Sequence, residues 1–136
     1  MRKVVIESPY AGDVQRNTEY ARLCLKDSLS RGESPIASHL LLTQVLDDTI
    51  PEERELGISA GLHWTDVADA HIFYVDYGLS SGMMQALNKT IKSNSPYEIE
   101  FRKILLNNCP PVITGYNSSP SSFKGRCPQD GGVLNK

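Results

Sequence analysis

The sequence lacks a strong charge of either sign and lacks long apolar runs. Its 136 residues carry a formal net charge of −2, and the acidic and basic residues are not gathered into long blocks. A non-specific nucleic-acid binder shows a basic stripe, so we expect no nucleic-acid partner. A membrane span needs roughly 20 predominantly apolar residues in a row. No run approaches that length, so we expect no membrane partner.

Cysteine is also scarce. The three cysteines are Cys24, Cys109 and Cys127, and their spacing is not that of metal ligands. We therefore expect neither a metal nor a cofactor. The basic start at residues 1–3 is interrupted too soon, by Glu7, to be a signal peptide. We interpret residues 2–7 as a first strand and expect a cytoplasmic protein.

The chain alternates short apolar runs with longer stretches of helical periodicity. Strands are predicted at residues 2–7, 35–39, 71–75 and 97–104. Three helices are predicted: one at residues 14–31, a second that begins at Pro51, and a third that follows the strand at 71–75 and ends at about residue 93. This order is typical of an α/β fold, a three-layer α/β/α sandwich with four to five mostly parallel strands. Residues 1–106 form this domain. Residues 107–136, rich in Pro, Ser, Gly and Asn, are expected to have no regular structure.

Local signals predict the helix boundaries and faces. Asp13 is expected to cap the first helix and Thr49 the second, which has Pro51 in its first turn. Residues 40–50 are predicted to be a loop that forms a lid or part of a pocket wall. In the second helix, Gly57 and Gly61 leave a patch without side chains that allows a close approach. The apolar stripe that we expect this helix to bury is Leu56, Ala60, Trp64 and Val67.

The corner from Asp76 to Met83 is the most informative stretch. It joins a buried strand to a helix through an acid, a glycine turn, two hydroxyls and a second glycine. A helix N-terminus presents free N–H groups and a positive dipole end, which favour anionic or hydroxyl-rich ligands. Ligands of open α/β sheets bind at such corners. Because three strand-to-helix loops open on the same edge, we predict a pocket formed by Glu7, Tyr10, His39, Asp47, Asp48 and Asp76.

Two interpretations remain open for each side chain at this corner. Asp76 either contacts a base or ribose, or caps the turn at Gly78. Ser80, Ser81 and Gly82 either bind a 5′-phosphate or only cap the helix.

The other pocket residues also have two interpretations. Glu7 is either an acid of the pocket or the partner of Arg16. Asp47 and Asp48 are either oxygen ligands for a magnesium-bound phosphate or ordinary acids at a helix start. His39 is either a hydrogen-bonding residue at a strand end or a base. The remaining assignments are that Tyr10 stacks on a base, that His63 and His71 have no role, and that Trp64 belongs to the core.

Several motifs occur in a fixed order: Ser8-Pro9-Tyr10, Asn17 with Ala21, Pro35 with His39-Leu40, Asp69, and Gly78 with Ser80-x-Gly82-Met83. Together they resemble the nucleoside 2-deoxyribosyltransferase-like superfamily, and most closely its small phage and bacterial branch, over about residues 3–100. The resemblance implies a flavodoxin-like arrangement, a nucleoside or nucleotide pocket, chemistry at the N-glycosidic bond, and a homo-oligomer. The candidate ligand-binding residues, from these motifs and from the converging loops, are Ser8, Tyr10, Gly12, Asn17, His39, Asp47, Gly78, Ser80, Ser81, Gly82 and Met83.

One departure from the family pattern concerns catalysis. The resemblance implies a glutamate nucleophile four residues after the second glycine of the corner; counted from Gly82, that position here is Ala86. A carboxylate suits the task because it stabilises an oxocarbenium-like transition state. Without it, the candidate catalytic residues are Asp76, Glu7 and Asp48.

Three functions follow as hypotheses. The first is a hydrolase- or transferase-like protein that binds a nucleoside or nucleotide and acts at its N-glycosidic bond. The second is a non-catalytic binder that sequesters or senses a nucleotide-derived signal and, if phage-encoded, acts in the cytoplasm of a bacterial host. The third is an interaction module that has kept the fold and lost the site.

Overall fold

The computed structural model describes residues 1–104. The C-terminal tail that the sequence predicts at residues 107–136 lies outside the described residues. Among residues 1–104, no helix is long and apolar enough to cross a membrane. The elements are β1 (Arg2–Glu7), α1 (Val14–Ser30), β2 (Glu33–Ile36), α2 (Ser38–Leu41), the 3₁₀ turn η1 (Leu42–Gln44), α3 (Pro51–His63), the 3₁₀ turn η2 (Trp64–Asp66), β3 (Ala70–Tyr74), α4 (Ser81–Lys92) and β4 (Tyr97–Glu100).

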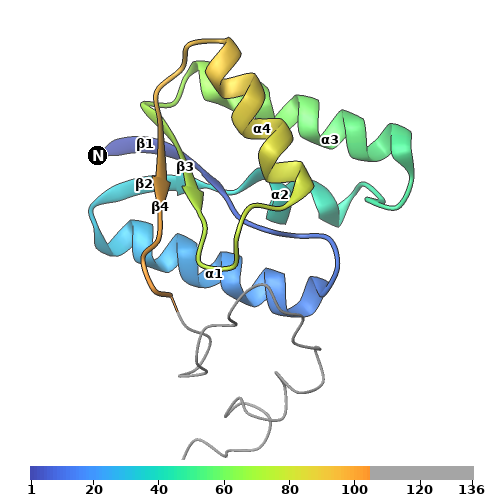
Figure 1. The fold of residues 1–136 in the computed structure, drawn as a ribbon, viewed down its shortest axis with the longest axis horizontal. Helices are drawn as coiled ribbons and strands as arrows, with labels where there is room; N and C mark the ends of the chain where they lie inside the picture. Colours follow the sequence, from blue (N-terminus) through green and yellow to red (C-terminus); the bar gives the residue numbers. More distant parts are fainter. Residues whose placement is uncertain (105–136) are drawn as a thin grey trace, which may run out of the picture.

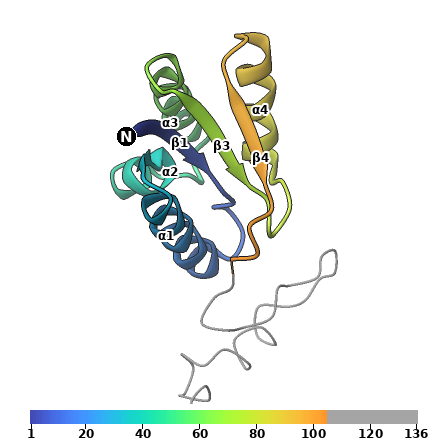
Figure 2. The same cartoon turned by 90° about the vertical axis from the view of Figure 1, so that its left-hand side faces the viewer.

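The four described strands form one sheet in the order β2-β1-β3-β4, and every pair is parallel. Parallel neighbours require crossover connections, and here helices supply them. Helix α1 covers one face of the sheet, and α3 and α4 cover the other (Figures 1 and 2). The predicted α/β class with a parallel sheet is therefore confirmed, and β1 and β3 are its central strands.

Each face of the sheet has its own core because successive strand side chains point to opposite sides. On the α1 side, Tyr20 and Cys24 pack against Ile6, Ile72 and Tyr74. On the other side, the α4 residues Met83, Ala86 and Leu87 pack against Phe73 of β3. The carboxyl ends of β1 and β3 are thus held between two packed layers.

The helix caps agree in part with the prediction. The Asp13 side chain accepts a hydrogen bond from the Arg16 N–H at 3.2 Å, and Ser80 accepts one from the Met83 N–H at 3.2 Å. The prediction that Thr49 caps α3 is wrong. Ile50 occupies that position without a side-chain cap, and the Thr49 hydroxyl donates to Asp47 at 2.6 Å.

The two outer strands differ from their predicted bounds. β2 was predicted at residues 35–39, but it spans Glu33–Ile36 because it pairs with β1 from Arg2 to Val5. Pro35 fits this position because β2 is an edge strand, where a missing N–H costs little. β4 ends at Glu100 and does not continue to residue 104.

The predicted loop at residues 40–50 is partly helical. Helix α2 and η1 occupy residues 38–44, and the Leu40 N–H donates to the Ala37 carbonyl at 3.1 Å. Residues 38–44, with their leucines and Thr43, include no helix-breaking Gly or Pro. The Thr43 hydroxyl donates to the His39 carbonyl at 2.7 Å. The prediction that this segment forms part of a pocket wall is confirmed, since Leu42, Thr43 and Leu46 line a cavity.

The predicted buried stripe of α3 is wrong. Leu56, Trp64 and Val67 are all more than half exposed. The helix buries its glycine face, because α2 packs closely against it. A methyl group on Gly61 would lie 2.5 Å from the Ser38 Oγ, and one on Gly57 would lie 3.3 Å from the Leu46 Cδ1. The predicted close approach to these glycines is confirmed.

Candidate functional site

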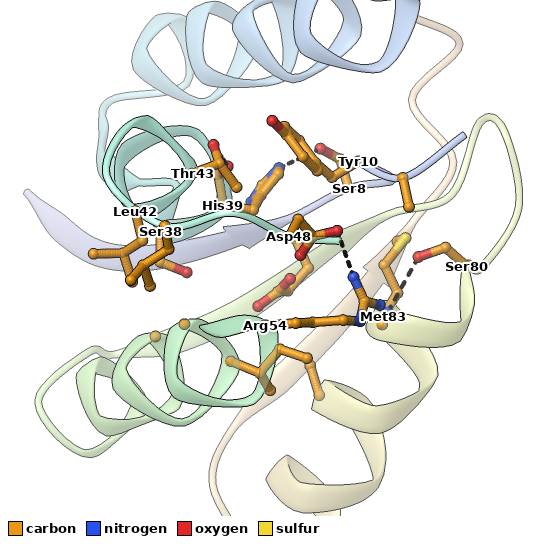
Figure 3. A pocket seen from close by; sticks show the side chains of 18 of the residues that line it. Ser8, Tyr10, Ser38, His39, Leu42, Thr43, Asp48, Arg54, Ser80 and Met83 are labelled. Atoms are coloured by element: carbon orange, nitrogen blue, oxygen red, sulfur yellow. Dashed lines mark hydrogen bonds and ion pairs between the residues drawn. The ribbon is translucent and has the colours of Figure 1, made fainter. Parts of the chain in front are cut away.

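A cavity opens at the carboxyl ends of β1 and β3. Helix α2 and η1 form one wall, α3 forms another, and the N-terminus of α4 closes the side near Ser80 (Figure 3). The space between its atoms, with the open mouth included, is about 800 Å³.

Nine of the residues predicted from the sequence line this cavity: Glu7, Ser8, Tyr10, His39, Asp48, Ser80, Ser81, Gly82 and Met83. Five others do not: Gly12, Asn17, Asp47, Asp76 and Gly78. The three loops expected to converge therefore do converge, from β1, from α2 and from the corner before α4.

Asp76 lies outside the cavity wall and is fully hydrogen-bonded. The Tyr20 hydroxyl donates to its Oδ2 at 2.7 Å, and the Lys103 N–H donates to its Oδ1 at 2.6 Å. The Asp76 N–H in turn donates to the Tyr20 hydroxyl at 3.1 Å. Burial raises the pKa of Tyr20, and the hydrogen bond to Asp76 raises it further, so the phenol remains a donor. The geometry favours a structural role for Asp76 over a catalytic one.

The other four predicted residues that lie outside the cavity are Asn17, Gly12, Asp47 and Gly78. The Asn17 amide donates to the carbonyls of Tyr10 and Ala11 at 3.1 and 3.0 Å, which fixes the loop that carries Tyr10. Gly12 has a φ of 97°, a backbone conformation that suits glycine. Asp47 accepts hydrogen bonds from Thr49 and faces solvent. The fourth, Gly78, has a φ of 83° in the turn before α4.

Ser8 and His39 form a hydrogen-bonded pair in the cavity. The Ser8 Oγ and the His39 Nε2 are 2.8 Å apart and point toward one another (Figure 3). Burial lowers the pKa of His39, although the negative charge of Glu7 partly opposes this, so the ring is neutral at physiological pH. The His39 Nδ1 is buried without a partner among the described residues. The pair therefore places one neutral imidazole in the wall.

A cation stands beside the N-terminus of α4. The Arg54 Nη1 donates to the Asp48 Oδ2 at 2.6 Å, and both residues line the cavity. The Arg54 Nη2 lies close enough to Gly82 that a Cβ there would be 3.3 Å away. The guanidinium thus lies near the free N–H groups of the first turn of α4, which itself favours anions.

Glu7, at the end of β1, is held by a buried histidine. Its Oε1 lies 2.9 Å from the Nε2 of His71, a side chain with no exposed surface. On its other side, the His71 Nδ1 lies 2.9 Å from the Thr90 Oγ1. The structure therefore joins a cavity carboxylate to a buried polar chain that ends on α4.

Sequence analysis missed several residues of the site. His71 was assigned no role because it lies inside a predicted strand, where its partners Glu7 and Thr90 are 64 and 19 residues away. Arg54 was missed because only the acids at the start of this helix were considered. A usable signal for it was its position in the first turn after Pro51, on the same side as the glycines. Ser38 and Thr43 were missed because α2 was not predicted.

Ala86 lies in the cavity wall and is buried. This is the position at which the resemblance places a glutamate nucleophile. The cavity therefore presents a methyl group at the position for which the resemblance implies a carboxylate nucleophile.

Residues 2–100 match a family model described as a domain of unknown function (DUF7768). No curated protein matches the sequence.

Proposed function

For a chain that belongs to the DUF7768 family, we propose a protein that binds a nucleoside or nucleotide-like ligand in the cavity and hydrolyses its N-glycosidic bond. The observation that carries the proposal is the convergence in one cavity of a helix N-terminus, the Arg54 guanidinium and the Glu7 carboxylate. These groups match the phosphate and the glycosidic bond of a nucleotide.

The phosphate end of the ligand belongs at α4. The first turn of this helix offers N–H groups, with Ser80 and Ser81 hydroxyls beside them and Arg54 opposite. Charge-assisted hydrogen bonds to phosphate are roughly twice as strong as neutral ones. A 5′-monophosphate therefore gains more from this wall than an unphosphorylated nucleoside does.

The base belongs against the less polar walls. Leu42, Leu46 and Ile58 line the cavity together with Tyr10, whose loop is fixed by Asn17. An apolar and aromatic surface of this kind suits the flat face of a nucleobase.

The reaction we propose proceeds without a covalent intermediate, because Ala86 offers no nucleophile. Water attacks the sugar carbon while a cavity carboxylate handles the proton. The two carboxylates of the candidate set that line the cavity are Glu7 and Asp48. Asp48 is paired with Arg54, which leaves Glu7 as the freer group.

The test is incubation of the full chain with a panel of nucleosides and nucleoside 5′-monophosphates, followed by chromatography for free base. We expect release from 5′-monophosphates, and less release from the matching nucleosides. A matched control is the variant Glu52→Gln, which changes an exposed acid outside the cavity. No release from any compound, under conditions where an active deoxyribosyltransferase turns over, would contradict the proposal.

Ala86 also supports a second candidate, a non-catalytic binder that sequesters or senses a nucleotide-derived signal. Such a protein needs the same cavity and no nucleophile. Ligand recovered intact after the complex is denatured would favour this candidate over hydrolysis. The absence of a thermal shift with mono-, cyclic and adenosine-diphosphate-ribose-type nucleotides would contradict it.

A homo-oligomer in the cytoplasm, in a bacterial host if phage-encoded, belongs to the same proposal. The edge strand β4 supports it. Alternate side chains of β4 and the residue after it, Tyr97, Ile99 and Phe101, are all at least two-fifths exposed, and an apolar edge of this kind commonly marks an interface. Sedimentation of the full chain tests it, and a monomer at all concentrations would contradict it.

A further inference from the structure

The Glu7 carboxylate has one committed oxygen and one available oxygen. Oε1 faces the Nε2 of the fully buried His71 at 2.9 Å. Among residues 1–104, Oε2 has no hydrogen-bond partner, and it is not one of the buried unpartnered atoms, so solvent reaches it. Glu7 lines the cavity with a side chain that is 15% exposed. A ligand in the cavity can therefore meet Oε2 directly.

The positions of the protons on His71 follow from its other neighbour. The Thr90 hydroxyl has a single proton, and it donates that proton to the Ala86 carbonyl at 2.8 Å. The Thr90 Oγ1 lies 2.9 Å from the His71 Nδ1 and can there only accept. A bare Nδ1 would place two lone pairs against each other in a buried site. The Thr65 hydroxyl is farther away, at 3.4 Å. The network thus assigns a proton to Nδ1.

A second proton is then required between His71 and Glu7. With Nδ1 protonated, a neutral ring has a lone pair on Nε2, and this lone pair would face a carboxylate oxygen at 2.9 Å. The contact becomes favourable when one more proton lies on Nε2 or on Glu7. We propose that Glu7 and His71 share this transferable proton, that Glu7 delivers it to the leaving nucleobase, and that His71 is its positioning residue.

This inference rests on the proposed hydrolysis and gives it a proton balance. The proton on Glu7 passes to a nitrogen of the base as the bond between that nitrogen and the sugar carbon breaks. The bond's electron pair stays on the base, which leaves as a neutral molecule. Water adds to the sugar carbon, and the proton it loses returns to Glu7. The net reaction consumes one water, and Glu7 ends as it began.

The far end of this polar chain approaches solvent on another side of the molecule. Thr65 and Thr90 line a shallow depression between α3 and α4, and charged groups stand around it: His63, Asp66, Lys89 and Lys92. The groups with charge or titratable protons that line the cavity together with Glu7 are Tyr10, His39, Asp48, Glu53 and Arg54. The polar chain thus runs from the cavity to this second depression.

Nuclear magnetic resonance of the ligand-free protein tests the shared proton without reference to activity. In ¹⁵N-labelled protein at neutral pH, we expect the shift of the His71 Nδ1 to be that of a protonated ring nitrogen. We also expect a second proton either on Nε2 or on the Glu7 carboxyl, which its ¹³C shift reports. A bare Nδ1 would overturn the proposal, since the pair would then hold no proton to give away.

Two variants and a control separate this proposal from a purely structural role. Glu7→Gln removes the shared proton, so Nε2 becomes a bare acceptor while Nδ1 stays protonated. Thr90→Val removes the acceptor for Nδ1 and shifts that nitrogen. Glu52→Gln leaves both nitrogens unchanged. Thermal unfolding of each variant shows whether it is folded.

Kinetics complete the test with the nucleotide that the unaltered protein hydrolyses. Glu7→Gln lowers kcat by at least about 100-fold, while KM changes little because binding groups remain. An unchanged kcat in this variant would overturn the role of Glu7. If the unaltered protein releases no base at all, the proposed function fails, and the resonance data still decide whether the pair carries the proton.

Discussion

Asp76 and Glu7 are two carboxylates at the ends of the two central strands, and the structure uses them differently. Asp76 faces α1, and both its oxygens accept hydrogen bonds from Tyr20 and Lys103. Glu7 faces the cavity side, and among residues 1–104 only one of its oxygens has a partner, His71. Position at a strand end thus brings a carboxylate to the functional edge of the sheet. Whether such a carboxylate can act on a ligand depends on whether one of its oxygens lacks a partner.

The same contrast extends to the two faces of the sheet. On the α1 face, Asp27 accepts hydrogen bonds from Arg31, Tyr74 and Arg102, all three at its Oδ2, so a second carboxylate there is held by the fold. On the other face, the cavity leaves groups such as Oε2 of Glu7 and Nδ1 of His39 without partners in the described residues. The carboxylates of the α1 face stabilise the fold, whereas polar groups on the cavity face are available to a ligand.

The largest expected effect is the loss of stability when Asp76 loses its hydrogen bonds on the α1 side. Asp76→Ala leaves the Tyr20 hydroxyl and the Lys103 N–H without their acceptor, and two such losses destabilise the fold by about 3 kcal/mol. Urea denaturation measures this change. Glu7→Gln, on the cavity side, keeps a hydrogen-bonding group for His71 and should change stability by less than about 1 kcal/mol. Equal losses in the two variants would break the comparison.

The next effect concerns ligand affinity on the cavity side. Arg54→Met keeps an unbranched side chain and removes its charge, which should weaken binding of a nucleoside 5′-monophosphate by about 2 kcal/mol, roughly thirtyfold. Calorimetric titration measures this loss. Binding of the matching nucleoside should change far less. Arg22→Met, on the exposed side of α1, is the control, and an equal loss there would contradict a local phosphate site.

A smaller effect is expected when the α1 face is titrated with acid. Partial burial alone would raise the pKa of Asp27, but hydrogen bonds from Arg31, Tyr74 and Arg102 outweigh it and hold the pKa below the usual value. Because the folded pKa is depressed, the ionised side chain stabilises the fold above about pH 4, the value in an unfolded chain. This contribution is lost as the pH falls through the folded pKa.

Urea midpoints measured from neutral to acid pH check this titration. Asp27→Asn should make the midpoint fall less steeply below about pH 4 than it does in the unaltered protein. Parallel curves for the two proteins would show that Asp27 contributes nothing to the acid sensitivity of the α1 face.

The smallest effect is expected on the outer surface of α3. Trp64 is 51% exposed, so Trp64→Gln should change the stability of the monomer by less than about 0.5 kcal/mol. Its tryptophan fluorescence should already be that of a solvated indole in the unaltered protein. A loss of several kcal/mol in this variant would mean that the indole is covered in solution, as it would be in an assembly of subunits.

Sequence patterns predicted the order of the elements well because strand and helix periodicities are local. The Asp13 and Ser80 caps were predictable for the same reason, since each acts within three residues of its partner. The face of α3 was not predictable from its apolar stripe. The glycines admitted α2 at close range, and this tertiary contact outweighed the burial of Leu56 and Trp64.

The candidate site was predictable at the level of the sheet edge and less so at the level of single groups. Topology brings Glu7, Ser8 and His39 to the same edge as Ser80, and the sequence alone indicated this. Whether a carboxylate there is free depends on distant partners, such as Tyr20 for Asp76 and His71 for Glu7, which lie 56 and 64 residues away. No local pattern reports such pairings.

The absence of a side chain at Gly61 sets the distance between α2 and α3, and with it the width of the cavity. Because a methyl group there would stand 2.5 Å from the Ser38 Oγ, even alanine would act as a wedge and push α2 away from α3. Helix α2 carries His39, which is bonded to Ser8 across the cavity. The width of the cavity and the length of the Ser8–His39 contact are therefore set together, by a residue on α3 that has no side chain to interpose.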